Sequence, residues 1–161
     1  MAGRKRRATA AVAERAPASY GPVIAAFVPD ASIAIAWVHP DQATAESNEW
    51  LGHLVAGATL VAPSVWPLEV ANALTVLARR RRLTTQERDA ALAALSELPV
   101  SLDHEGSARG LSELAAMAVA ESLSVYDASY LELARRRSLP LACRDGPLRA
   151  AARRHRVQVT P

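Results

Sequence analysis

The stretch Phe27–Trp37, "FVPDASIAIAW", places one carboxylate inside a long apolar run. Apolar residues dominate from Val23 to Val38, and Asp30 interrupts them. Burying an unpaired carboxylate is costly, and such a group tends to protonate rather than stay charged in a dry environment. We therefore expect Asp30 either to cap a turn at the edge of the core or to face a cation.

The sequence around Asp30 predicts a strand followed by a helix. Residues 23–28 are short and apolar on both faces, which is typical of a strand in a parallel sheet. Pro29 cannot donate a backbone hydrogen bond, so we expect this strand to end at or near it. Residues 33–39 predict a short helix or turn. Residues 41–56 predict a longer helix that stops at Gly57.

Strands and helices alternate along the rest of the chain. We expect further strands at residues 59–62, 100–102, 139–143 and 157–160. We expect further helices at residues 63–82, 84–98, 107–123, 124–137 and 147–155, the first of them with Pro67 in its first turn. This alternation predicts an α/β fold, in which a central, mostly parallel five-stranded sheet is flanked by helices.

Length and composition favour one globular domain. The chain has 161 residues, of which 50% are apolar, and it lacks any apolar run near the twenty residues that span a membrane. We place the domain at residues 23–161. Residues 1–22 read as a basic, disordered extension, because Glu14 and Arg15 interrupt the apolar segment that a secretory signal requires. The single cysteine, Cys143, favours a reducing, cytoplasmic setting.

The net charge of +3 is modest, but the arginines are clustered. Three clusters occupy residues 79–82, 135–137 and 153–156. The simplest interpretation places them in the last turns of helices, where cations interact favourably with the helix dipole.

Three more carboxylates stand out beside Asp30. Asp145 follows the predicted strand at residues 139–143, and the carboxyl ends of parallel strands meet at one edge of a sheet. Glu69 and Asp127 lie in mostly apolar helical sequence, with no cation one turn away. Asn72 follows Glu69 by three residues and shares its helix face. The remaining acids lie mostly in visibly polar stretches.

Each acid also has a simpler structural explanation. Asp145-Gly146 is a common turn dipeptide, and Asp30 fits the cap of a turn. Ser124 and Asp127 have capping-box spacing, and Glu69 could pair with a distant arginine. Four unrelated accidents are less plausible than one shared site.

The chemistry of four carboxylates suits a hard cation. Carboxylate oxygens without convergent lysine, cysteine or histidine ligands suit Mg²⁺ or Mn²⁺ better than zinc or copper. Such ions activate water for cleavage of phosphodiester bonds. A magnesium-dependent phosphotransferase is a weaker alternative, since Lys5 is the only lysine.

The motifs "VPDASIAIAW", "PLEVANAL", "SVYDASYLELA" and "PLACRDGPLRAAA" resemble the successive acidic motifs of PIN-domain ribonucleases, and most of all the VapC toxins of bacterial VapBC toxin–antitoxin pairs. The resemblance covers residues 25–160, and the four acids are separated by 39, 58 and 18 residues. It implies a PIN fold and Mg²⁺- or Mn²⁺-dependent endoribonuclease activity. It also implies that Asp30 and Asp127 are the main metal ligands, with Glu69 and Asp145 completing the acidic pocket.

The resemblance extends to supporting residues, with one departure. Ser32 occupies the hydroxyl position after the first acid, and Asn72 the amide position after the second. The family usually carries Thr or Ser two residues before the last acid, where this chain has Cys143. A thiol is a poor hydrogen-bond partner, so the tuning of the site is in doubt.

The resemblance also implies partners, namely an RNA substrate, a VapB-like antitoxin that covers the acidic pocket, and a second copy of the toxin in a homodimer. No membrane partner is expected. Trp37, Trp50 and Trp66 could line a groove for the antitoxin or simply fill the core. The alternative function is a PIN-like module that binds RNA or a partner with weak or no catalysis.

Overall fold

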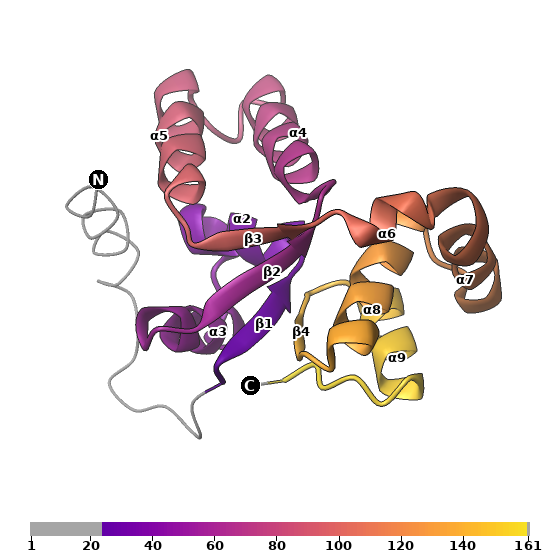
Figure 1. Ribbon diagram of the computed structural model, residues 1–161. Coiled ribbons are helices and arrows are strands. Elements are labelled where there is room, and N and C mark those ends of the chain that lie inside the picture. The colour runs from indigo at the N-terminus through magenta and orange to yellow at the C-terminus, as the bar shows by residue number, and fades with distance from the viewer. Residues whose placement is uncertain (1–23, 161) are drawn as a thin grey trace.

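The computed structural model describes residues 24–160, in which four parallel strands form one sheet (Figure 1). The order across the sheet is β3-β2-β1-β4. The strands are β1 (Ala26–Pro29), β2 (Thr59–Pro63), β3 (Val100–Asp103) and β4 (Leu141–Ala142). The α/β class and the parallel sheet predicted from the sequence are confirmed. The predicted extension at residues 1–22 lies outside the described residues.

The prediction of a fifth strand was wrong, because residues 157–160 form no strand. Their contact with the sheet is a backbone hydrogen bond of 2.8 Å from Leu141 to the carbonyl oxygen of Gln158. The neighbouring strand β4 has only two residues, so it offers little edge on which a further strand could pair.

Pro29 is the last residue of β1, where its missing N–H is tolerated. Val28 and Asp30 donate backbone hydrogen bonds to the carbonyl oxygens of Pro140 and Ala142, at 2.8 and 2.9 Å. Alternate residues of a strand direct their N–H groups to the same neighbour, so Pro29 deprives β4 of no donor.

The first group of helices lies together on one side of the sheet (Figure 1). It contains α2 (Ala31–Val38), the 3₁₀ turn η1 (Pro40–Gln42), α3 (Ala45–Val55), α4 (Trp66–Arg79) and α5 (Thr85–Ser96). The single helix expected at residues 41–56 is divided, since Thr44 and Ser47 form a capping box that starts α3. Gly57 follows α3 with a φ of 104°, a conformation that favours glycine.

The second group of helices is centred on α8 (Val125–Arg137), which packs against β1, β2 and β4. Its other members are α6 (Glu105–Ala108), the π-helical turn η2 (Gly110–Leu114), α7 (Ala115–Glu121) and α9 (Gly146–Arg154). The one helix predicted over residues 107–123 is thus broken into pieces near Gly110, since glycine is a weak helix former. Among residues 24–160, no helix has the length and apolar character needed to cross a membrane.

The core is built around the strand that precedes Asp30. Phe27 and Val28 are fully buried. The ring centroid of Phe27 lies 6.3 Å from that of Trp37 and 4.8 Å from that of Trp50. Trp66 is also buried, so the three tryptophans fill the core and do not line an open groove.

Four helices end in the same way, with a residue other than glycine in the left-handed conformation. After α4, for example, Arg81 has a φ of 55°, and the amide of Arg82 donates to the carbonyl oxygen of Leu77 at 2.9 Å. This is the Schellman pattern, in which glycine is usually favoured. The equivalent residues after α7, α8 and α9 are Ser122, Ser138 and Arg156.

Candidate active site

The topology of the sheet places Asp30 at a switch point in the strand order. The chain builds β2 and β3 on one side of β1 and then places β4 on the other side. Ligands of open parallel sheets bind at such a switch point, outside the carboxyl ends of the strands. Pro29 of β1 pairs with Ala142 of β4, so Asp30 and the segment that carries Asp145 leave the sheet at the same edge. This part of the prediction is confirmed.

Asp30 is held rigidly at the junction of β1 and α2. It is the N-cap of α2, where its Oδ1 accepts a hydrogen bond of 2.9 Å from the amide of Ile33. The hydroxyl of Ser32 lies 2.7 and 2.9 Å from the two carboxylate oxygens. The same hydroxyl accepts a hydrogen bond of 3.1 Å from the amide of Arg144. Ser32 therefore links Asp30 to the segment after β4.

The environment of Asp30 disfavours its ionised form. Only 7% of the residue is exposed. Burial raises the pKa of Asp30 to about 6, and the charges of Asp127 and Glu69 act in the same direction. The hydrogen bonds from Ser32 and Ile33 oppose this shift but do not cancel it.

Glu69 lies in the first turn of α4 and is half-buried. Its Oε2 accepts a short hydrogen bond from the hydroxyl of Tyr130, which lies one turn after Asp127 on α8. Burial raises the pKa of Glu69, the Tyr130 hydroxyl lowers it, and the charge of Asp127 raises it again. The bond from Tyr130 therefore joins two helices at the point where the acids meet.

Asp127 lies in the first turn of α8 and interacts with the cap of that helix. The hydroxyl of Ser124 donates to its carboxylate at 2.6 Å and accepts from its amide at 3.0 Å. The cap predicted at Ser124 is confirmed, but the reciprocal bond of a capping box, from the amide of Ser124 to the carboxylate of Asp127, is not formed. The charge of Asp127 acts on Asp30 and Glu69.

Asp145 differs from the other three acids in its exposure to solvent. It is exposed and caps α9, accepting a hydrogen bond of 2.8 Å from the amide of Leu148. Its charge acts on Cys143, which is fully buried. Burial raises the pKa of the Cys143 thiol, with a further contribution from the charge of Asp30. Cys143 is therefore a neutral thiol, and the charges of Asp30 and Asp145 both act on it.

The four acids differ in burial, since Asp30 is buried, Glu69 and Asp127 are half-buried and Asp145 is exposed. Asp30, Glu69 and Asp127 are close enough for their charges to interact. Among the residues that the structure describes, no three His, Cys, Asp or Glu side chains are already gathered as ligands of one metal ion. Asn72 lies exposed on α4, three residues after Glu69.

Two features of the structure escaped the sequence analysis. Tyr130 was missed, although it lies three residues after Asp127 and so shares its helix face. Asp103 and Glu132 are each only 4% exposed and are not surface acids. Arg136 donates to them at 2.7 and 2.8 Å. The ion pair of Glu132 with Arg136 could have been predicted, because the two residues are four positions apart on one helix.

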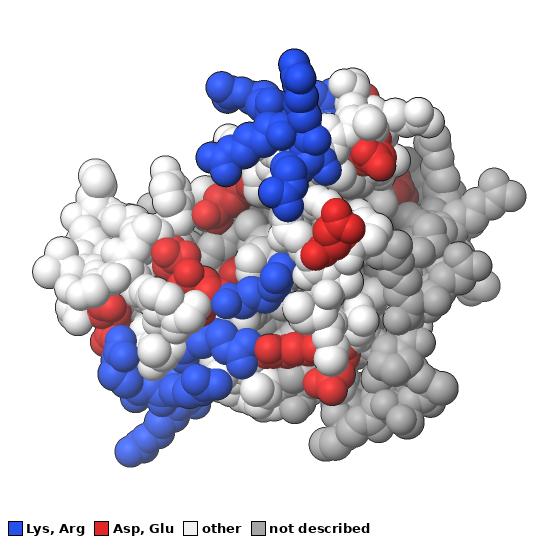
Figure 2. Space-filling view, turned by 180° about the vertical axis from the view of Figure 1, so that it is seen from behind, with Lys and Arg blue, Asp and Glu red and all other residues white. Residues whose placement is uncertain are grey.

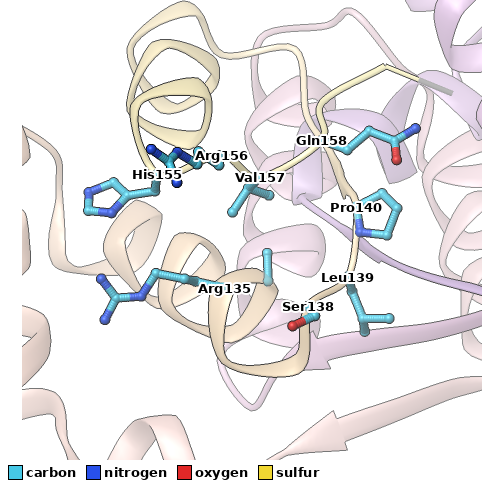
Figure 3. A pocket seen from close by; sticks show the side chains of 9 residues that line it. Arg135, Ser138, Leu139, Pro140, His155, Arg156, Val157 and Gln158 are labelled. Carbon is cyan, nitrogen blue, oxygen red and sulfur yellow. The ribbon is translucent and has the colours of Figure 1, made fainter.

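One cavity lies away from the acids, at the opposite edge of the sheet. It encloses about 370 Å³ where the C-terminal ends of α8 and α9 meet the start of β4. Figure 3 shows Arg135, His155 and Arg156 on one side of this cavity and Pro140 and Gln158 on the other. A smaller cavity of about 150 Å³ includes Val65, Asp103 and Tyr126 in its wall, and none of the four acids lines it.

Comparison with known proteins identifies the family of this chain. None of the curated proteins matches it. The crystal structure of PAE2754 from Pyrobaculum aerophilum is similar, with a TM-score of 0.58, 28% sequence identity and 80% of each chain covered. The profile of the PIN domain family matches residues 27–154 and so includes all four acids. PIN domains are typically metal-dependent nucleases, and this chain belongs to the PIN domain family.

Proposed function

We propose that the protein is a Mg²⁺- or Mn²⁺-dependent endoribonuclease that acts in the cytoplasm as the toxin of a type II toxin–antitoxin pair. The nuclease proposal rests on Asp30, which is buried at the switch point of the sheet. Burial and the charges of two neighbouring carboxylates disfavour its ionised form. The toxin role, the VapB-like antitoxin and the homodimer rest on the resemblance of the acidic motifs to VapC toxins.

The donor chemistry of the site fits a hard divalent cation. The charges of Asp30, Glu69 and Asp127 interact, and burial together with mutual repulsion makes the charge of Asp30 unfavourable without a cation. Asp30, Glu69 and Asp127 would hold the ion, and Asp145 would assist from the segment after β4. When bound, such an ion supplies an activated water and stabilises the leaving oxygen of a phosphodiester.

The residues around the acids position them for this role. Ser32 fixes both oxygens of Asp30, Tyr130 orients Glu69, and Ser124 orients Asp127. Because each partner is itself anchored in a helix or a strand end, the carboxylates are preorganised with little conformational freedom to lose on binding.

The test is cleavage of RNA with Mg²⁺ or Mn²⁺ by the wild-type protein and by Asp30→Asn. We expect cleavage by the wild type, and we expect Asp30→Asn to lose at least about two orders of magnitude in rate, as when a group that stabilises the transition state is removed. Asp41→Asn, in the exposed turn η1, is the control and should retain activity. Equal cleavage by wild type and Asp30→Asn would contradict the proposal.

A second candidate function is a PIN-like module that binds RNA or a partner without cleavage. Two observations favour it, namely that the described acids are not gathered as a ready metal site and that Cys143 stands where the family has a hydroxyl. Metal titration distinguishes the two functions. A non-catalytic module should show no thermal stabilisation by Mg²⁺ or Mn²⁺, whereas a ligand that binds only the folded state raises stability by mass action.

A further inference from the structure

We propose that the arginines at residues 79–82 form a docking site for the backbone of the RNA substrate, several nucleotides from the bond that is cut. This inference rests on the proposed function and adds a substrate requirement to it, since an RNA too short to reach the arginines gains nothing from them.

The four arginines are all exposed and are free to bind phosphate. None of them forms an ion pair with a described residue. Other arginines are used within the fold, for instance Arg136 with Asp103, Arg149 with Glu46 and Arg154 with Glu121, at 2.6 to 2.7 Å. The charge of residues 79–82 is therefore not compensated by the described part of the protein.

One acid near the cluster, Glu87, is hydrogen-bonded to the cap of α5. A cavity of about 340 Å³ between the end of α4 and the start of α5 includes Arg81, Arg82 and Glu87 in its wall. Glu87, however, accepts hydrogen bonds of 2.7 and 2.8 Å from the amide and hydroxyl of Thr84, which caps α5. These hydrogen bonds keep Glu87 ionised, but it forms no ion pair with Arg81 or Arg82, and the four arginines outnumber this carboxylate.

Helix α4 connects this cluster to the acids. Glu69 lies in its first turn and Arg79 is its last residue, ten positions later. At a rise of about 1.5 Å per residue, the arginines begin about 15 Å from Glu69. Nucleotides stacked about 3.4 Å apart cover that distance in about five steps. An RNA anchored at the acids would reach the arginines with its fifth or sixth nucleotide.

The distribution of charge on the surface is consistent with an RNA that runs from the acids to the arginines at residues 79–82. In Figure 2, arginines gather in two groups on one face of the protein, one of them at the top, where α4 and α5 meet in Figure 1, and acidic side chains lie between the groups. Acids alone would repel an RNA backbone, whereas flanking cations attract it.

Arg81 offers a variant that removes charge without damaging the fold. Its φ of 55° is a conformation in which glycine is not strained, so Arg81→Gly should leave stability nearly unchanged. Arg156 is a matched control, because it is also exposed, has a φ of 58°, follows the helix α9 and forms no ion pair with a described residue. It lies beside the cavity at the opposite edge of the sheet.

The experiment measures binding of fluorescent oligouridylate by anisotropy. It uses Ca²⁺ in place of Mg²⁺ or Mn²⁺, so that an ion with a preference for oxygen ligands can anchor the RNA at the acids, and gel electrophoresis checks that the oligomer stays intact. With an oligomer of about twelve nucleotides, we expect Arg81→Gly to bind about threefold more weakly than Arg156→Gly and the wild type at low salt. The slope of log affinity against log salt should fall by about 0.7 for the one lost contact. With about four nucleotides, the three proteins should bind alike.

The outcomes separate this inference from the proposed function. Equal binding of the longer oligomer by Arg81→Gly and Arg156→Gly would overturn the docking site, even if the wild type cleaves RNA. A loss specific to Arg81→Gly would support it, even if the wild type cleaves none. Equal losses in both variants would show a diffuse attraction by net charge and would also overturn the proposal.

Discussion

At the scale of single residues, Asp30 combines a capping role with an electrostatic cost. Its carboxylate satisfies the amide of Ile33 at the start of α2, and it does so while nearly buried beside two other acids. A neutral amide would perform the first task equally well, since asparagine is among the best N-cap residues. The charge itself is therefore unfavourable for the metal-free fold.

Asp30→Asn should accordingly stabilise the metal-free protein at neutral pH. Because the pKa of Asp30 is raised from 3.8 to about 6, the folded state binds more protons than the unfolded state across this range, and wild-type stability falls as pH rises through it. Above pH 6 the variant should gain about 1 to 3 kcal/mol, and below pH 4 it should gain nothing. Urea unfolding at several pH values measures the difference.

Asp145→Asn is the control for this prediction. Asp145 also caps a helix, but it is exposed, so its replacement should not stabilise the protein. If Asp30→Asn were less stable than wild type at pH 7, the charge of Asp30 would stabilise the metal-free fold, and the prediction would be wrong.

Tyr130 is the second residue with a specific prediction. Its hydroxyl donates to the half-buried carboxylate of Glu69, and a hydrogen bond to a charged group contributes about 1.5 to 3 kcal/mol. Tyr130→Phe should lower the free energy of unfolding by about that amount. Adding Glu69→Gln should remove most of the difference, because the two changes share one interaction. Tyr126→Phe, on an exposed ring of the same helix, should be nearly neutral.

At the scale of elements, α8 holds the site together. Its first turn supplies Asp127, its second turn supplies Tyr130, and its last turns contact the end of β3 through Arg136. Burial would raise the pKa of Asp103, but hydrogen bonds from Arg136 and the amide of Gly106 outweigh it and lower the pKa below its usual value. Arg136 is thus the main cation that stabilises the anion of Asp103, with a longer contact of 3.4 Å from Arg137.

Arg136→Gln should destabilise the protein by about 3 kcal/mol, since it leaves the buried carboxylates of Asp103 and Glu132 without their main cation. Thermal unfolding at neutral pH measures the loss. Arg88→Gln removes a cation from the pair with Asp89, whose side chain is 59% exposed, and should cost less than about 1 kcal/mol. Similar losses in both variants would contradict the structural role of the buried cluster.

At the scale of the whole molecule, charge is separated along the helices. Helices α4, α8 and α9 carry Glu69, Asp127 and Asp145 at or near their N-terminal ends. The same helices carry arginines at their C-terminal ends. Both placements are favourable for the helix dipole. The result is an acidic edge on a protein whose overall charge is positive.

The acidic edge predicts that divalent cations stabilise the folded protein. Mg²⁺ or Mn²⁺ at about one hundred times its dissociation constant should raise the stability of the wild type by about 2.7 kcal/mol. Asp127→Asn should be at least as stable as wild type without metal, because it relieves repulsion on Asp30 and Glu69, and it should respond weakly to metal. Differential scanning fluorimetry with and without the ions measures both effects. An undiminished metal response in Asp127→Asn would exclude it as a ligand.

Much of the fold could be predicted because its signals are local. Apolar runs, helix caps and the glycine after α3 are properties of neighbouring residues, and they located β1 to β4 and most helices to within a few residues. The prediction of a fifth strand was wrong because a strand forms only where it pairs with a neighbour. The neighbouring strand β4 has two residues, and residues 157–160 form one backbone hydrogen bond with it. The break near Gly110 was not predicted, because an apolar pattern does not reveal where a helix changes from α-helical to π-helical hydrogen bonding.

The sequence by itself determined which residues carry charge in apolar surroundings, and therefore Asp30, Glu69 and Asp127 as candidates. Only the tertiary structure decided their relations, since Glu69 and Tyr130 are 61 residues apart and meet solely because α4 and α8 converge at one edge of the sheet. It also decided that Asp145 is exposed and that Asp103 is buried. The physical reason is that burial and Coulomb interactions depend on distances in space, which residue spacing along the chain does not determine.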